Sequence, residues 1–172
     1  EFSISGGTCT AGGTVAAAAS CTISVGFTPS AAGARSASLV VTHNATGGQS
    51  TTSLSGTGVA LTPVIGVSPT TLSFTHTVGS ASADQTVTVS NTGTAPLVIS
   101  TLALGGAQAA DFHISAGSTC TNGTSVAVSG SCLIKLSLTP AATGARTASL
   151  AITHNATGSP SAVTLNGSGT AV

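Results

Sequence analysis

The sequence has 172 residues, of which only three are Lys or Arg and three are Asp or Glu, and its formal net charge is zero. Charged residues make up 3% of the chain, against about 25% in an average globular domain. Because nucleic acids and anionic membranes are held largely by positive charge, this composition argues against either as a partner. Net charge also keeps protein molecules apart, so its absence favours self-association. No apolar run approaches the roughly 18 residues of a membrane-spanning helix, so we expect no membrane insertion.

Much of the sequence occurs twice. With an offset of 111 residues, Cys9–Gly58 aligns without gaps to Cys120–Gly169, and 27 of the 50 aligned positions are identical. Upstream, EFSIS (1–5) matches DFHIS (111–115). Residues 61–110 have no counterpart in the first copy. The chain therefore contains the second half of one repeat followed by a complete one.

The first element in chain order is the half repeat, residues 1–58. Its apolar positions include Ile23, Val25 and Phe27, and later Leu39 and Val41. Four strands without their partners would leave such a face in water, where each Å² of apolar surface costs about 25 cal/mol. We therefore expect strands from outside this segment to complete it, either from preceding residues of a longer repeat protein or from a neighbouring subunit.

A short linker, residues 59–64, follows. It lies within GTGVALTPVIG (56–66) and contains Pro63, which stiffens a connection. We expect it to allow successive units little freedom.

The complete repeat, residues 65–172, reads as short strands separated by turn residues, with no sustained helical period. Val87 and Val89 alternate with polar residues, as a half-buried strand requires. Strands are predicted over 65–75, 85–90, 97–104, 111–115, 131–138, 146–153 and 161–166. NTGTAP (91–96) predicts a turn between two of them. The predicted fold class is all-β, as tandem immunoglobulin-like Greek-key sandwiches of which the first is represented only by its C-terminal half.

The cysteines form two pairs with the same spacing. Cys9 and Cys21 are 12 residues apart, as are Cys120 and Cys132. We predict one disulfide in each unit, worth about 3 kcal/mol, and hence an oxidising, extracellular location. The alternative is a shared metal site, but no histidine stands at ligand spacing from either pair.

The motif THNATG stands at 42–47 and again at 153–158. It predicts a hairpin turn in which Gly47 and Gly158 have positive φ. The residues at the strand ends, His43 and His154, are expected to bond loop backbone. They could share a metal only if domains or subunits bring equivalent ends together. The turn residues of both copies are His43, Asn44, Gly47, His154, Asn155 and Gly158.

The single arginine of each unit, Arg35 or Arg146, follows a Gly-Ala pair, and the one shared acidic position is Glu1 or Asp111. We expect each arginine to bond loop carbonyls or to pair with the acid, a structural role. The alternative is a ligand-binding arginine.

A catalytic site is not expected. Asp111 and His113 could be combined with a serine, but they are predicted to share one strand face, the first unit has Ser3 in place of His113, and no G-x-S-x-G motif occurs. Four sequons allow glycosylation if a secretory machinery reads them. They begin at Asn44, Asn122, Asn155 and Asn166.

The segments TVTVSNTGTAPLVI, DFHIS, CLIKLSLTPAATGARTASLAITHN and VTLNGSGT together resemble the Hydin-type (ASH) immunoglobulin-like domains, in particular the bacterial choice-of-anchor D repeats. The resemblance covers 61–169 and, for the second half of the domain, 1–58. It implies a sandwich related in form to the major sperm protein domain, usually found as repeats in large exported proteins, with no shared catalytic residue.

The function expected from these observations is structural: a non-catalytic, cofactor-free repeat module of a secreted bacterial surface fibre, filament or adhesive stalk, with copies of itself as partner. The alternative is an adhesin or accessory module that binds a glycan or protein. Sugar-binding sites usually use aromatic platforms, yet this chain has no Trp or Tyr, and its four Phe residues are predicted to be core. A cytoplasmic ciliary or centrosomal role conflicts with the paired cysteines.

Overall fold

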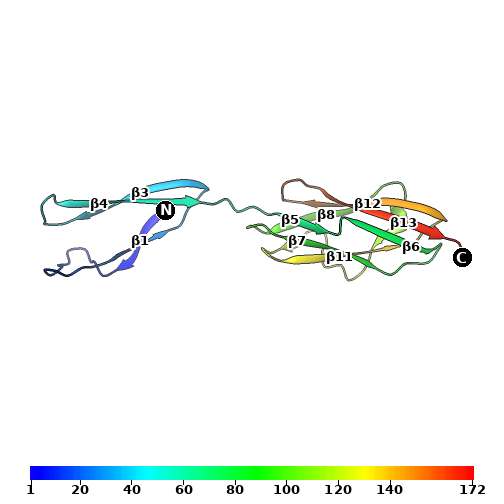
Figure 1. The fold of residues 1–172 in the computed structure, drawn as a ribbon, viewed down its shortest axis with the longest axis horizontal. Coiled ribbons are helices and arrows are strands. Elements are labelled where there is room, and N and C mark those ends of the chain that lie inside the picture. Colours follow the sequence, from blue (N-terminus) through cyan, green and yellow to red (C-terminus); the bar gives the residue numbers. More distant parts are fainter. The chain divides into compact units, whose positions relative to one another are not determined.

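The computed structural model describes residues 1–172 and divides the chain into two compact units, unit 1 (Glu1–Ala60) and unit 2 (Leu61–Val172) (Figure 1).

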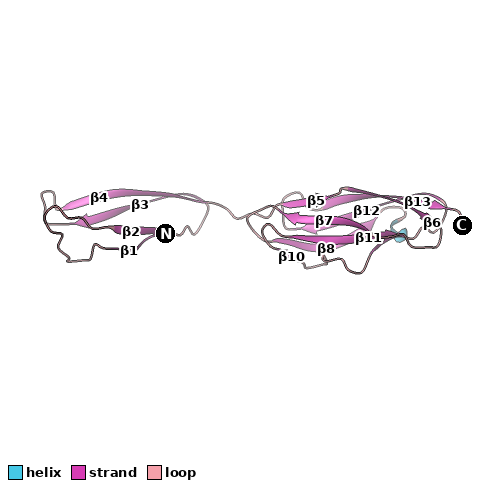
Figure 2. Ribbon diagram, turned by 60° about the horizontal axis from the view of Figure 1, so that its bottom comes forward, coloured by secondary structure: helices cyan, strands magenta, loops and turns pink.

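Nearly all the regular structure is strand, with one 3-10 turn, η1 (Ala109–Asp111) (Figure 2). The strands of unit 1 are β1 (Phe2–Gly7), β2 (Ile23–Phe27), β3 (Gly33–Thr42) and β4 (Gln49–Gly58). Those of unit 2 are β5 (Ile65–Ser68), β6 (Thr71–Thr77), β7 (Gln85–Asn91), β8 (Leu97–Gly105), β9 (Phe112–Ile114), β10 (Ser125–Val126), β11 (Ser131–Leu138), β12 (Gly144–His154) and β13 (Ser161–Thr170).

Unit 2 is a β-sandwich, so the predicted fold class is confirmed. One sheet has the strand order β10-β8-β12-β13-β6 and the other β5-β7-β11-β9. All pairings are antiparallel except that of β6 with β13. The alternating apolar residues of both sheets meet in one core, in which Val87, Val89 and Leu150 are fully buried.

The predicted strand 65–75 is wrong as a single element. It is two strands in different sheets, because β5 pairs with β7 and β6 pairs with β13. Pro69 lies at the crossing and has no N–H to offer a sheet ladder. The positions that face the core also change phase there, from the partly buried Ile65 and Val67 at odd positions to the buried Leu72 and Phe74 at even positions.

The predicted strand 111–115 is shorter than expected, since Asp111 ends the 3-10 turn and only Phe112–Ile114 are extended. Asp111 is buried whereas His113 is exposed, so these two residues do not share a strand face. The short strand β10 was not predicted, because two residues are too few to show a period.

Unit 1 is two separate hairpin-like pairs, β1 with β2 and β3 with β4. They correspond to β9, β11, β12 and β13 of unit 2, so counterparts of β5 to β8 are missing. Among residues 1–60 only Gly58 is buried. Phe2 and Phe27, predicted to be core, stack with ring centroids 4.6 Å apart but stay partly exposed, whereas Phe74 and Phe112 are buried. Unit 1 therefore has the apolar faces of a sandwich without its core.

Candidate functional site

Both disulfides predicted from the cysteine spacing are present. Cys9 is bonded to Cys21 and Cys120 to Cys132, with Cα atoms 5.0 and 5.1 Å apart. The loops are held alike, since the amide of Cys9 donates to the Thr22 carbonyl and that of Cys120 to the Leu133 carbonyl, both at 3.0 Å. The pair in unit 2 is buried, at 0% and 6% exposure, while the pair in unit 1 is partly exposed. Two disulfides favour an oxidising environment for the protein.

Each arginine lies beside the acid that stands just before the matching strands β1 and β9, Glu1 in unit 1 and Asp111 in unit 2. Arg35 Nε is 3.0 Å from Glu1 Oε2, without hydrogen-bond alignment. Arg146 Nε is 3.5 Å from Asp111 Oδ2 and donates to the Ala142 carbonyl at 3.1 Å. A second nitrogen of Arg146, Nη2, donates to the Thr143 carbonyl at 3.1 Å.

The acids also hold the loop that precedes the arginine strand. Asp111 Oδ2 accepts the amide of Ala141 at 3.3 Å, and Glu1 Oε1 accepts both the amide and the hydroxyl of Ser30. The hydroxyl and amide of Ser30, followed by the charge of Arg35, lower the pKa of the Glu1 carboxyl. Each arginine and acid pair thus joins the residue before β1 or β9 to the loop and first strand of the long hairpin, β3–β4 or β12–β13, which is the geometry of a structural tie.

The two THNATG motifs form hairpin turns, and Gly47 and Gly158 have φ of 97° and 83°, as predicted. His154 is 5% exposed, its Nδ1 accepts the amide of Ala156 at 3.2 Å, and its Nε2 is 3.0 Å from Ser161 Oγ. Burial lowers the pKa of His154. His43 has the matching contact to Ser50 at 3.0 Å, but its Nδ1 has no partner.

Asn155 has a role that its turn position did not predict. Its Oδ1 accepts the amide of Val98 at 2.8 Å, its Nδ2 donates to the Pro96 carbonyl at 3.2 Å, and its own amide donates to the Val98 carbonyl at 3.2 Å. These three hydrogen bonds hold the β12–β13 turn against the start of β8. Asn44 occupies the same position in unit 1, where β8 has no counterpart. No local signal could show this, because the partners are 57 residues apart.

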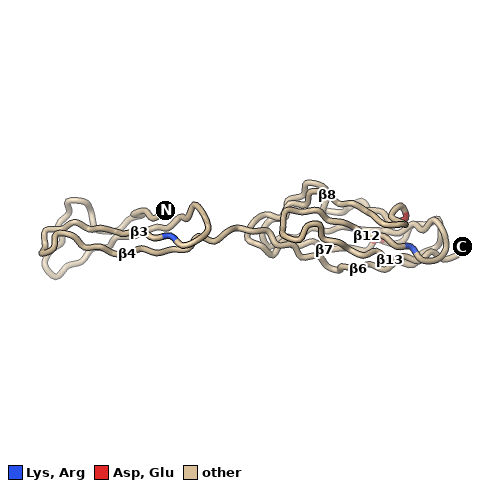
Figure 3. Tube along the Cα trace, turned by 90° about the horizontal axis from the view of Figure 1, so that it is seen from above, with Lys and Arg blue, Asp and Glu red and all other residues tan.

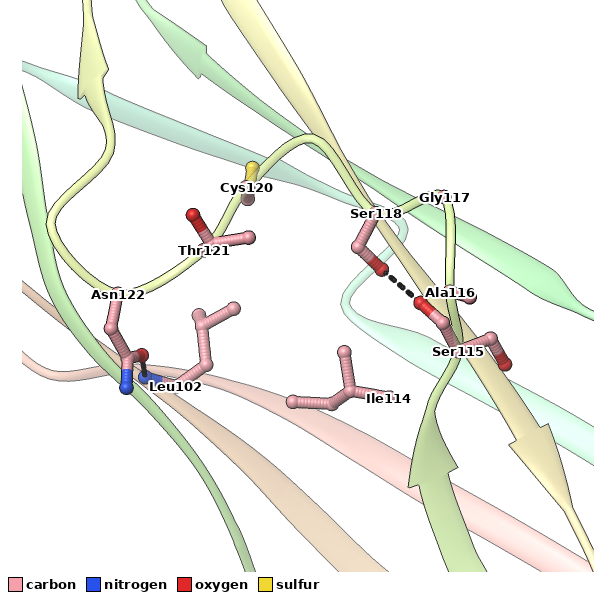
Figure 4. Close-up of a pocket in the computed structure, with 9 residues that line it drawn as sticks. All are labelled: Leu102, Ile114, Ser115, Ala116, Gly117, Ser118, Cys120, Thr121 and Asn122. Atoms are coloured by element: carbon pink, nitrogen blue, oxygen red, sulfur yellow. Dashed lines mark hydrogen bonds between the residues drawn. The ribbon is translucent and has the colours of Figure 1, made fainter.

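Unit 2 has an open depression of about 340 Å³ beside its disulfide loop (Figure 4). The side chains of Leu102 and Ile114 point into it, and Asn122 Oδ1 accepts the Leu102 amide at 2.8 Å on one side. Its lining contains no acid or base. The residues are Leu102, Ile114, Ser115, Ala116, Gly117, Ser118, Cys120, Thr121 and Asn122.

Unit 1 has an opening of about 230 Å³ between its two strand pairs. Phe2, Val25, Leu39 and Leu54 line it, together with Ser3, Ile4, Ala37 and Ser38. The first four correspond to Phe112, Leu136, Leu150 and Leu165, which are 0–2% exposed in unit 2. The opening is therefore the interior of a sandwich that lacks half of its strands.

The other candidate groups do not come together. Asp111 is engaged by Arg146 and Ala141, while His113 faces solvent on β9, so they do not form the relay of a catalytic triad. No three His, Cys, Asp or Glu side chains are grouped as metal ligands would be. The sequon asparagines Asn44, Asn122, Asn155 and Asn166 are all exposed.

Charged residues are few in both units (Figure 3). The structure has no helix of the length and apolarity needed to cross a bilayer.

Residues 61–162 match the family described as "Abnormal spindle-like microcephaly-assoc'd, ASPM-SPD-2-Hydin", abbreviated ASH. No curated protein sequence matches the chain. Among solved structures, a protein of unknown function from Porphyromonas gingivalis W83 is similar, with 13% identity and a TM-score of 0.50 over 97% of this chain and 83% of that one. A family 123 glycoside hydrolase from Clostridium perfringens has 9% identity and a TM-score of 0.51 over 64% of this chain and 27% of its own.

The human CEP192 ASH/PapD-like domain 7 has 13% identity and a TM-score of 0.48, over 63% of this chain and 86% of that one. At 13% and 9% identity, the likeness to the Porphyromonas gingivalis protein and to the glycoside hydrolase shows the fold alone. The family rests on the sequence match, which spans more than half of the chain and agrees with the motifs quoted above. The chain belongs to the ASH family of immunoglobulin-like domains.

Proposed function

We propose that this chain is a structural repeat module of a secreted bacterial surface fibre, filament or adhesive stalk. The observation that carries the proposal is the recurrence of one disulfide-stapled half-sandwich, with its arginine tie and its hairpin turn, at an offset of 111 residues. Repeated units of this kind lengthen a protein, and the shared features are structural and not catalytic. A head-to-tail contact between such units gives an open filament unless its rotation happens to close.

The segment between the repeats supports this function. The Thr62 carbonyl accepts the amide of Thr94 at 2.8 Å, and the Val64 carbonyl accepts that of Thr92 at 2.9 Å. Thr62 also donates to the hydroxyl of Thr94 at 3.0 Å. Half of the predicted linker 59–64 is therefore bound to the β7–β8 turn, and only residues 59–61 remain as a free connection. A connection this short suits a load-bearing array better than independent domains.

Electron microscopy of the native assembly tests the proposal. We expect extended fibres or stalks at the cell surface that an antibody against unit 2 labels along their length, with all four cysteines in the Cys9–Cys21 and Cys120–Cys132 pairs on non-reducing peptide mapping. Discrete particles inside the cell, or free thiols in the native protein, would contradict it.

A ligand-binding module, such as an adhesin or an accessory domain of a larger exported protein, is the second candidate. The depression beside the Cys120–Cys132 loop favours it, because Ser, Thr and Asn side chains can bond sugar hydroxyls or a peptide. Binding of a glycan or protein that is lost in Asn122→Ala while the fold remains intact would support this function over the first.

A further inference from the structure

Unit 2 shows which strands pair with the edges that are unpaired in unit 1. Residues 61–110 supply β5 to β8, of which β7 pairs with β11, β8 with β12 and β6 with β13. In unit 1 the corresponding strands β2, β3 and β4 each have one unpaired edge. An unpaired edge presents a row of free backbone N–H and C=O groups, which is a template for another strand.

The side chains give the same indication. The opening lined by Phe2, Val25, Leu39 and Leu54 is apolar, and in unit 2 the matching face packs against the fully buried side chains of β7 and β8. These are Val87, Val89, Leu97 and Ile99, each 0% exposed. The chemistry that fits the opening is therefore a set of strands with alternating aliphatic residues.

We propose that unit 1 is the receptor half of a sandwich, and that its occupant is a four-strand segment with the residue pattern of 61–110 that continues directly into Glu1. This rests on the proposed function only in treating the two units as repeats of one design. In unit 2 Ala110 is followed at once by Asp111, the counterpart of Glu1, so the occupant reaches its place by the same chain path. A second copy of the chain is a poorer donor, because its own β7 and β8 would have to leave their core.

Unit 2 also gives the register of the occupant. Its third strand, the counterpart of β7, runs antiparallel to β2, its fourth antiparallel to β3, and its second parallel to β4. Asn44 fixes the start of the fourth strand, as Asn155 does for β8 through its bonds to Pro96 and Val98. Asn44 is thus a positioning residue that has no partner in unit 1 alone.

The test is a chain in which a second copy of residues 61–110 is joined before Glu1, with residues 1–172 following unchanged. Hydrogen exchange is measured residue by residue, and unit 2 serves as the internal reference. We expect the amides of β2, β3 and β4 to exchange at least about tenfold more slowly than in the 172-residue chain. The control chain carries Val87→Asp and Val89→Asp in the added segment only, and should show no such protection.

Equal exchange in the two extended chains would overturn the proposal. A 172-residue chain that forms a dimer with a protected unit 1 would overturn the choice of occupant, since a second copy would then be the donor. Neither result depends on fibres being seen at the cell surface, so failure of the proposed function is recognised separately, by microscopy.

The role of Asn44 has its own test. In the extended chain Asn44→Ala should speed exchange near the start of the added fourth strand, just as Asn155→Ala is expected to do at Val98 in unit 2. In the 172-residue chain Asn44→Ala should change nothing. An extended chain that is insensitive to Asn44→Ala, while Asn155→Ala has its effect, would show that Asn44 is only a turn residue.

Discussion

The arginine of each repeat makes its contacts within one loop and to one acid. In unit 2 the Arg146 side chain is only 16% exposed and the Asp111 side chain 9%, so water cannot readily replace either partner. The side chains of their counterparts in unit 1, Arg35 and Glu1, are 29% and 27% exposed. The arginine and acid pair is therefore expected to contribute more to the stability of unit 2 than to that of unit 1.

Arg146→Ala should lower the stability of unit 2 by about 1–3 kcal/mol, because it removes two hydrogen bonds and leaves a buried carboxylate without its cation. Calorimetry would show this as a lower Tm of the unit 2 transition. Arg35→Ala is the matched control and should leave that transition in place. An unchanged Tm together with a lost binding activity would instead assign Arg146 to a ligand site.

His154 predicts a pH dependence for unit 2. Burial lowers the pKa of His154 in the folded protein, whereas in the unfolded chain it has its ordinary value of 6.5. Below that value the unfolded chain binds the additional proton, so unfolding is favoured as pH falls through 6.5 towards the folded pKa. The loss is at most about 1.4 kcal/mol per pH unit. Denaturant titrations at pH 7.5 and 5.5 should show the loss in the native chain, and His154→Gln should remove most of it.

At the level of elements, strand β13 depends on a glycine for its packing. A Cβ on Gly167 would lie 2.9 Å from Leu138 Cδ2, 3.1 Å from Arg146 Cβ and 3.2 Å from Phe112 Cζ. Leu138 and Phe112 are buried, so they have little room to move. Gly56 has the same position on β4, where a Cβ would meet the ring of Phe27.

Gly167→Ala should therefore destabilise unit 2 by about 1–3 kcal/mol through overpacking. Chemical unfolding of unit 2 measures it. Gly105→Ala on β8 is the control, because the nearest atom to its added Cβ is Ser149 Oγ at 3.9 Å, and it should be neutral or slightly stabilising. Equal stability of the two variants would show that the core at Gly167 can relax.

At the scale of the whole molecule the two units differ in what holds them. Unit 2 has a core of 19 buried apolar residues, whereas unit 1 has only Gly58 buried and relies on its disulfide, its arginine tie and its strand pairs. Backbone that is not packed opens often, and proteases cleave it there.

Limited proteolysis of the 172-residue chain with a protease of broad specificity should therefore degrade unit 1 and leave a stable fragment that starts near residue 61. Mass spectrometry of the digest identifies the fragment. If unit 1 survives as long as unit 2, it has a stabilising partner, and the oligomeric state of the sample must then account for it.

The sequence by itself determined the features that depend on neighbours along the chain. The spacing of Cys120 and Cys132 determined a disulfide, the alternation around Val87 and Val89 determined a strand with one buried face, and Gly158 determined a tight turn. Each follows from local geometry: the reach of a loop, the period of two in a strand, and the freedom of glycine at positive φ. The internal repeat added the prediction that residues 1–58 are half of a domain.

Only the tertiary structure decided which strands become neighbours. It divided 65–75 between two sheets, placed Asp111 in a buried turn and not on a strand face, and joined Asn155 to the start of β8, 57 residues away in the chain. The physical reason is that the alternation of apolar residues in a strand shows which face is buried. It does not show which strands pair with its two edges. That choice is made by packing the whole set of strands at once, and in unit 1 half of that set is missing.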